Sequence, residues 1–169
     1  MKRKSERDRE FTEFVTARRA SLTHVATLLL SGDRARAEDV VQTALTRLYL
    51  SWARVRPETL DAYARRCVVN AVIDDRRKLF RRRESVQAEL PELAAADDTG
   101  SGDSASMLAL LGTLAARQRA AVVLRYVEGL SVAETAQAMG CSEGNVKSQC
   151  ARGLERLREV LPDRARIFA

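Results

Sequence analysis

Residues 131–158 read SVAETAQAMGCSEGNVKSQCARGLERLR, and this stretch predicts two helices joined by a tight turn. Ser131 and Ser142 each precede a helical pattern, where a hydroxyl oxygen accepts hydrogen bonds from the unpaired N–H groups of a first turn. Gly140 lies between them, and glycine readily adopts the positive φ angle with which many helices end. The pattern predicts a helix-turn-helix, a motif whose second helix enters the major groove of DNA.

The second predicted helix runs from Ser142 through Leu157 and has an apolar face and a polar face. Residues three and four positions apart share one side of a helix, and the apolar ones here are Val146, Cys150, Gly153, Leu154, Leu157 and Leu161. The other side carries Glu143, Asn145, Lys147, Ser148, Gln149 and Arg152. A helical hairpin with a solvated outer face is the alternative interpretation. The caps, the turn glycine and the basic face occur together, and this combination favours DNA binding.

The charge of the chain also favours an anionic partner. Its 169 residues include 29 Lys and Arg against 23 Asp and Glu, a formal net charge of +6. With a helix-turn-helix present, nucleic acid is the first candidate. Most of the positive charge is arginine, whose planar guanidinium suits phosphate and guanine. Aromatic residues make up only 5%, which argues against a platform that stacks many unpaired bases.

The composition argues against several other kinds of site. Cys67, Cys141 and Cys150 are widely spaced without a C-x-x-C pair, so we expect buried thiols in a reducing compartment. His24 is the only histidine, which disfavours a histidine-based zinc site and most histidine-dependent catalysis. The sequence has no Gly-rich phosphate loop and no nucleophile elbow, so we predict no cofactor, no metal and no enzyme. It lacks a secretory signal and a run of ~20 apolar residues, so we expect a soluble cytoplasmic protein.

A first helix is predicted from Phe11 to Leu29. Residues 1–10, MKRKSERDRE, form a charge run that we expect to fray. Gly32 suits the C-terminal cap of this helix, and Asp33 can cap the next one.

The second helix, Ala35 to Ala53, presents an acidic patch early in its length. Glu38, Asp39 and Gln42 lie towards its exposed side. Acidic residues in a first turn are stabilised by the helix dipole, which is a purely structural explanation. In a basic chain they also form a suitable dock for a positively charged protein surface, and both interpretations stay open.

The loop Arg54–Glu58 leads to a third helix, which Thr59 can cap and which extends to about Arg83. Its later part is dense in charge: Asn70, Asp74, Asp75, Arg76, Arg77, Lys78, Arg81, Arg82 and Arg83. Most charge runs are solvated faces. A basic run this dense at the end of an amphipathic helix favours contact with a phosphate backbone.

The sequence therefore predicts an all-α fold of two small helical lobes. Residues 84–106 contain Glu and Asp but no Lys or Arg, and their Gly and Ser content indicates a flexible acidic linker. The N-terminal lobe is expected over 1–83. The C-terminal lobe, 107–169, is expected to add a helix from Arg117 to Glu128, ended by Gly129, to the helix-turn-helix.

Two blocks, one of two stretches in the first lobe and one in the second lobe, together resemble the extracytoplasmic-function sigma factors of bacteria, in particular the sigma-E-like actinobacterial type. AEDVVQTALTRLYLSW (37–52) resembles the polymerase-binding helix of that family. AYARRCVVNAVIDDRRK (62–78) resembles its promoter-reading helix, with Asn70 and Asp74 as the Asn-x-x-x-Asp pair. LAARQRAAVVLRYVEGLSVAETAQAMGCSEGNVKSQCARGLERLR (114–158) resembles the region that binds the upstream promoter element. Both blocks, in order across an acidic linker, make the resemblance specific.

This resemblance implies an alternative sigma factor, which directs core RNA polymerase to specific promoters without a cofactor. The β′ clamp helices would contact Glu38, Asp39 and Gln42, and the β flap is a second implied polymerase contact. The minus-ten element would face Asn70, Asp74, Arg76, Arg77 and Lys78, beside a pocket of the Arg54–Glu58 loop for an extruded base. The minus-thirty-five element would be read or clamped by Asn145, Lys147, Ser148, Gln149 and Arg152. An anti-sigma factor is a further implied partner.

Some positions depart from the family pattern. Gln149 stands where Arg is common, and glutamine suits adenine whereas arginine suits guanine. Thr135 replaces a usual Ile, which weakens packing between the two helices, and Tyr63 replaces a usual Trp. The alternatives to a sigma factor are a stand-alone helix-turn-helix regulator, which binds DNA without polymerase, and an antagonist, which binds polymerase without reading promoters.

Overall fold

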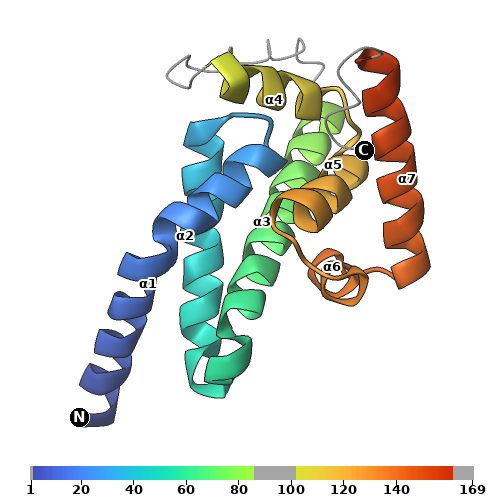
Figure 1. Ribbon diagram of the computed structural model, residues 1–169. Coiled ribbons are helices and arrows are strands. Elements are labelled where there is room, and N and C mark those ends of the chain that lie inside the picture. The colour runs from blue at the N-terminus through green and yellow to red at the C-terminus, as the bar shows by residue number, and fades with distance from the viewer. Residues whose placement is uncertain (1, 86–101, 162–169) are drawn as a thin grey trace. The chain divides into compact units, whose positions relative to one another are not determined.

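The structure, a computed structural model, describes residues 2–85 and 102–161, and they are almost entirely helical, with no strand among them. The chain divides into two compact units, Met1–Ala94 and Ala95–Ala169 (Figure 1). The predicted all-α class with two helical lobes is confirmed.

Over residues 2–85, the N-terminal unit has three long helices: α1 (Lys2–Leu29), α2 (Arg34–Ser51) and α3 (Leu60–Ser85). Two short 3₁₀ turns, Trp52–Arg54 and Pro57–Thr59, connect α2 to α3, which run antiparallel side by side (Figure 1). The side chains buried most completely come from all three helices: Val25, Ala26, Ala37, Val41, Leu48, Val68 and Val69.

The expectation that residues 1–10 fray is wrong over the described residues 2–10, because α1 already begins at Lys2. The Tyr49 hydroxyl of α2 donates to Asp8 Oδ1 at 2.5 Å and accepts from Arg7 Nη2 at 3.1 Å. Arg7 also lies over the Tyr49 ring, and Phe11 meets that ring edge-on with centroids 5.0 Å apart. These contacts with α2 stabilise the first turns of α1, whose polar and charged sequence alone does not predict a stable helix.

The helix ends in this unit follow the predicted caps with one exception. Gly32 has φ of +93° after α1, and Asp33 Oδ1 accepts from the Arg36 N–H at the start of α2. Thr59 does not cap α3. It lies in a 3₁₀ turn that continues into the helix, and its hydroxyl donates to the Arg56 carbonyl at 3.1 Å.

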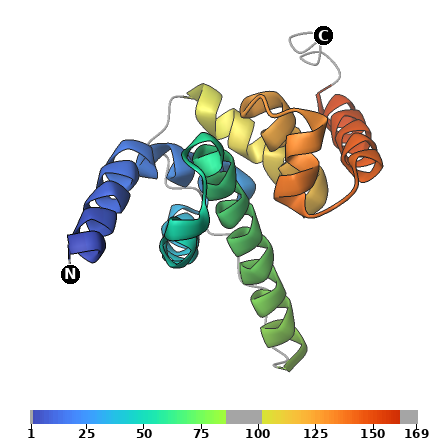
Figure 2. The same cartoon turned by 90° about the horizontal axis from the view of Figure 1, so that it is seen from below.

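Over residues 102–161, the C-terminal unit has four α-helices: α4 (Gly102–Gly112), α5 (Ala116–Val122), α6 (Val132–Met139) and α7 (Glu143–Val160). A π-helical turn, Val123–Val127, continues α5. The helix expected over 117–128 is therefore present, with an α-helical first part and a π-helical second part. In the view of Figure 2, α6 and α7 are joined by a short connection. The core of this unit contains Leu111, Leu114, Ala121, Val122, Val123, Leu124 and Val146.

Helices occupy both ends of the segment expected as a linker. α3 continues to Ser85, and α4 begins at Gly102, five residues before Met107. The apolar run that starts at Met107 favours a helix, and α4 extends this helix by five residues towards the N-terminus, to Gly102. The middle of the expected linker, 86–101, lies outside the described residues, and the domain boundaries stay a prediction.

Candidate nucleic-acid and protein interfaces

The helix-turn-helix is formed as its cap residues predict. Ser131 Oγ accepts from the Glu134 N–H at 3.1 Å, and the Glu134 carboxylate accepts from the Ser131 N–H at 2.7 Å. This reciprocal pair is a capping box. Gly140 ends α6 with φ of +63°, and Ser142 Oγ accepts from the Asn145 N–H at 3.1 Å to begin α7.

α7 packs on α5 through its predicted apolar face. Val146 is fully buried, and Cys150 and Gly153 are also buried. Burial raises the pKa of the Cys150 thiol. Gly153 lies so close to α5 that a Cβ built on it would be 2.8 Å from Val122 Cγ2. The close packing fixes which side of α7 is turned outward.

The outward side of α7 carries the side chains expected to contact DNA. Lys147, Ser148 and Arg152 are exposed. Asn145 and Gln149 are half-buried at the edges of this face, so they reach a ligand less freely.

Two more basic residues lie beside this face and were missed from the sequence. Arg125 and Arg158 line a pocket of about 360 Å³ together with Lys147 and Tyr126. The Arg125 guanidinium donates to the Leu130 carbonyl and so holds the connection between α5 and α6. Arg158 lies seven residues after Ala151, which also lines the pocket, so the two residues share one face of α7. This spacing could have identified Arg158 from the sequence.

The basic segment of α3 is exposed from Arg76 onward. Arg76, Arg77 and Lys78 are exposed, as are Arg81, Arg82 and Arg83, whereas Asn70 is half-buried. Partial burial and the neighbouring Arg36 lower the pKa of the Arg76 guanidinium. These positive side chains can therefore approach phosphates.

The two acidic residues of the same segment are engaged with α2. Arg47 Nη2 lies 2.8 Å from Asp74 Oδ2, and Arg36 Nε donates to Asp75 Oδ2 at 3.2 Å. A second hydrogen bond from Arg36 reaches the same oxygen. The family resemblance placed Asp74 among the residues that face the minus-ten element, but the sequence gave no sign of its arginine partner.

The acidic patch of α2 faces solvent. Glu38, Asp39 and Gln42 are all exposed, while the intervening Val40 and Val41 are buried against the other helices. The patch is thus available to another macromolecule.

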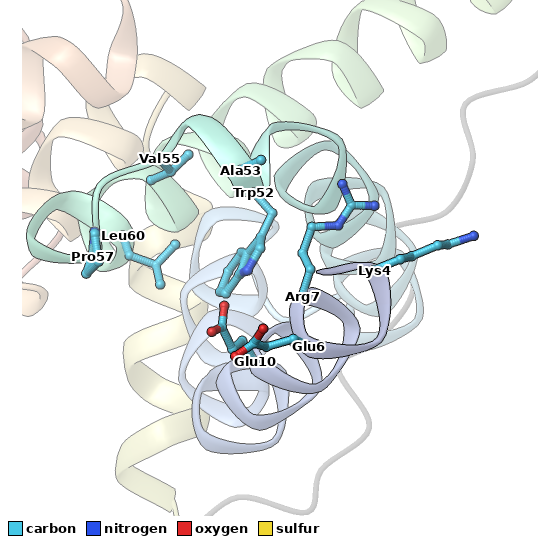
Figure 3. A pocket seen from close by; sticks show the side chains of 9 residues that line it. All are labelled: Lys4, Glu6, Arg7, Glu10, Trp52, Ala53, Val55, Pro57 and Leu60. Carbon is cyan, nitrogen blue, oxygen red and sulfur yellow. The ribbon is translucent and has the colours of Figure 1, made fainter. Parts of the chain in front are cut away.

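A pocket of about 660 Å³ opens where the α2–α3 connection meets the first turns of α1 (Figure 3). Trp52, Ala53, Val55, Pro57 and Leu60 supply apolar lining. The opposite wall is charged and comes from α1: Lys4, Glu6, Arg7 and Glu10. The loop side of this pocket was expected, and the α1 side was missed, because those residues were expected to fray.

Neither a metal-binding cluster nor a membrane-spanning helix is found among the described residues. None of them form a cluster of three or more histidine, cysteine or acidic side chains able to hold a metal ion. Among the described helices, none has the length and apolar character needed to span a membrane. Burial raises the pKa of the Cys67 thiol, which makes this cysteine a poor nucleophile.

Two family descriptions match the sequence, one in each unit. Residues 14–83 match "Sigma-70 region 2", which includes α2 and most of α3. Residues 104–157 match "Sigma-70, region 4", which includes α6 and most of α7.

Relatives match nearly the whole chain. The RNA polymerase sigma-E factor of Streptomyces avermitilis is 41% identical over 158 residues, which cover 92% of this chain and 87% of the relative. The sigma-E factor of Streptomyces coelicolor is 42% identical over 155 residues, covering 90% and 86%.

Solved structures share the fold. The sigma factor RpoE of Bartonella quintana, in complex with the anti-sigma factor NepR, has a TM-score of 0.78 and 26% identity, covering 92% of this chain and 98% of that chain. CnrH, in complex with the cytosolic domain of CnrY, has a TM-score of 0.65 and 22% identity, covering 93% and 90%.

Proposed function

This chain belongs to the extracytoplasmic-function group of the sigma-70 family, and we propose that it is the subunit that brings core RNA polymerase to specific promoters. One observation carries this proposal: each of the two sigma regions has an exposed charged surface suited to its partner. The surface of α2 is acidic and suits a basic protein surface, and the surfaces of α3 and α7 are basic and suit DNA. It acts in the cytoplasm as a binding subunit, and the chemistry of RNA synthesis belongs to the polymerase.

The acidic patch of α2 docks on the polymerase. Glu38, Asp39 and Gln42 face the β′ clamp helices, and the C-terminal unit contacts the β flap. The exposure of all three side chains supports this role. Opposite charges across such an interface speed association and select the partner.

The basic segment of α3 holds the minus-ten element. Arg76, Arg77 and Lys78 contact its phosphates, and Asn70 reaches a base edge. Phosphate contacts position a protein on DNA, whereas base contacts supply the sequence preference. The exposure of the three basic side chains supports their role.

The 660 Å³ pocket receives a base extruded from this element. Extruding a base costs a few kcal/mol, and stacking on an apolar surface offsets part of that cost. Trp52, Val55 and Pro57 offer such a surface (Figure 3).

The minus-thirty-five element lies along α7. Lys147, Ser148 and Arg152 project to solvent and clamp the backbone or reach base edges. Asn145 and Gln149, at the margins of that face, contribute the finer preference, with glutamine favouring adenine. An anti-sigma factor masks these surfaces when the protein is inactive; the RpoE structure with NepR supports a partner of this kind.

The proposal is tested by adding the purified chain to bacterial core polymerase and a promoter library and sequencing the initiated transcripts. We expect initiation that depends on both this chain and the promoter sequence. Polymerase binding without initiation would indicate an antagonist instead. DNA binding without polymerase binding would indicate a stand-alone regulator.

A further inference from the structure

Two ion pairs join α2 to adjacent residues of α3, and we call them the α2–α3 ion pairs: Arg47 with Asp74, and Arg36 with Asp75. Side-chain exposure is 41% and 40% in the first pair and 35% and 34% in the second. The four side chains are therefore partly withdrawn from solvent, where charges interact more strongly than at a fully exposed site.

The arrangement of the two pairs restricts movement of α3 along α2. Arg36 and Arg47 are three helical turns apart, which places them on the same face of α2 but ~16 Å from each other along its axis. Their partners are consecutive residues of α3. The arginines therefore reach Asp74 and Asp75 from opposite directions, and a slide of α3 either way lengthens one pair.

The pairing also decides what α3 offers to DNA. An uncompensated carboxylate next to a phosphate is repelled by it. Asp74 and Asp75 are neutralised by arginines of their own chain, immediately before the exposed Arg76, Arg77 and Lys78. The two carboxylates that precede Arg76, Arg77 and Lys78 thus carry their own counter-charges and do not oppose the approach of these three side chains to the backbone.

We propose that Asp74 and Asp75 are positioning residues and do not read bases. They fix the basic segment of α3 relative to α2, the helix that carries the polymerase-facing Asp39. The inference rests on the proposed function, because promoter and polymerase are the two ligands whose geometry the ion pairs connect. It revises the role that the family resemblance implied for Asp74.

A double-mutant cycle in the full-length chain tests this role. The variants are Arg47→Ala, Asp74→Ala, their combination, and the exchange Arg47→Asp with Asp74→Arg. Each is assayed with core polymerase at a temperature where circular dichroism shows it folded. We expect each single variant to lower open-complex formation about two- to fivefold, the range of a partly exposed ion pair. The double variant should be no worse than either single one, and the exchange should recover much of the loss.

Base preference distinguishes positioning from reading. Minus-ten elements carrying each of the four bases at every position are compared for all variants. A positioning role leaves the ranking of bases unchanged in every variant. A changed ranking at one position in Asp74→Ala but not in Arg47→Ala would overturn the proposal. So would normal open-complex formation by both folded single variants.

A matched pair serves as the control. Arg18 of α1 and Asp61 at the start of α3 lie 2.9 Å apart with side chains 50% and 49% exposed, far along α3 from the basic segment. Arg18→Ala and Asp61→Ala should leave promoter opening unchanged.

The ion pairs can be judged even if the proposed function fails. If the wild-type chain initiates no transcription, urea unfolding of the same variants still measures the coupling of Arg47 and Asp74. Zero coupling free energy between Arg47 and Asp74 would refute the positioning role of the α2–α3 ion pairs. Absence of transcription together with a measurable coupling free energy would refute only the proposed sigma function.

Discussion

Replacing Gly153 with alanine should destabilise the C-terminal unit, although alanine is the better helix former. The new Cβ would lie 2.8 Å from Val122 Cγ2, roughly 1 Å inside the ~3.5–4.0 Å at which carbon atoms pack best. Val122 is buried, and its β-branched side chain has little χ1 freedom with which to move aside. Overpacking of this kind costs about 1–3 kcal/mol. Alanine returns at most about 1 kcal/mol through helix propensity, so we expect a net loss of about 1 kcal/mol.

Gly144 provides the matched control in the same helix. A Cβ there would have Ser142 Oγ as its nearest neighbour, at 4.0 Å. Gly144→Ala therefore gains propensity without a clash, and the two variants should differ by about 2 kcal/mol, since the propensity gain is common to both. Hydrogen exchange of α5 and α7 peptides in the full chain measures the difference. Equal protection in the two variants would refute the steric argument.

Four further outcomes follow from contacts described above. Thr135 is fully buried, and within the described residues its Oγ1 has no hydrogen-bond partner. Thr135→Val should therefore raise the free energy of unfolding by about 1 kcal/mol or more in urea titrations. An unchanged urea midpoint would contradict this. Tyr49→Phe removes both hydrogen bonds to the first turns of α1, and faster hydrogen exchange confined to those turns should result. Asp39→Ala should weaken association with core polymerase in fluorescence anisotropy titrations while leaving α-helical content intact, and equal affinity would remove Asp39 from the interface. Arg152→Ala should reduce promoter affinity and lower the salt slope by about 0.9 if it contacts one phosphate, which titrations at several salt concentrations measure.

The helix-turn-helix could be predicted in detail because its determinants are local. Ser131 and Ser142 lie within three residues of the N–H groups they cap, and the positive φ of Gly140 depends on its own lack of a side chain. Such features can be recognised in a window of a dozen residues. The same is true of Asp33 at the start of α2.

The features that could not be predicted depend on partners distant in the sequence. Tyr49 is more than forty residues from Asp8 and Arg7, so the charged start of the chain gave no sign of the contacts that keep it helical. Asp74 likewise belongs to a motif that suggests DNA contact, while its partner Arg47 lies on another helix. Periodicity identifies which face of a helix is buried, but it does not identify the ionic partner across the interface.

The π-helical turn over Val123–Val127 changes the phase of the helix that contains it. In an α-helix, residues 126 and 127 would share the buried side of Val122 and Val123, four positions earlier. Here the Glu128 N–H bonds to the Val123 carbonyl, five residues back, and Tyr126 and Val127 are 57% and 37% exposed. The wider turn therefore rotates positions 126 and 127 away from the direction that an α-helix would give them, and both apolar side chains lie at the surface. We expect the deletion of one residue in this turn to restore the α-helical phase and to turn positions 126 and 127 towards the side of Val122 and Val123.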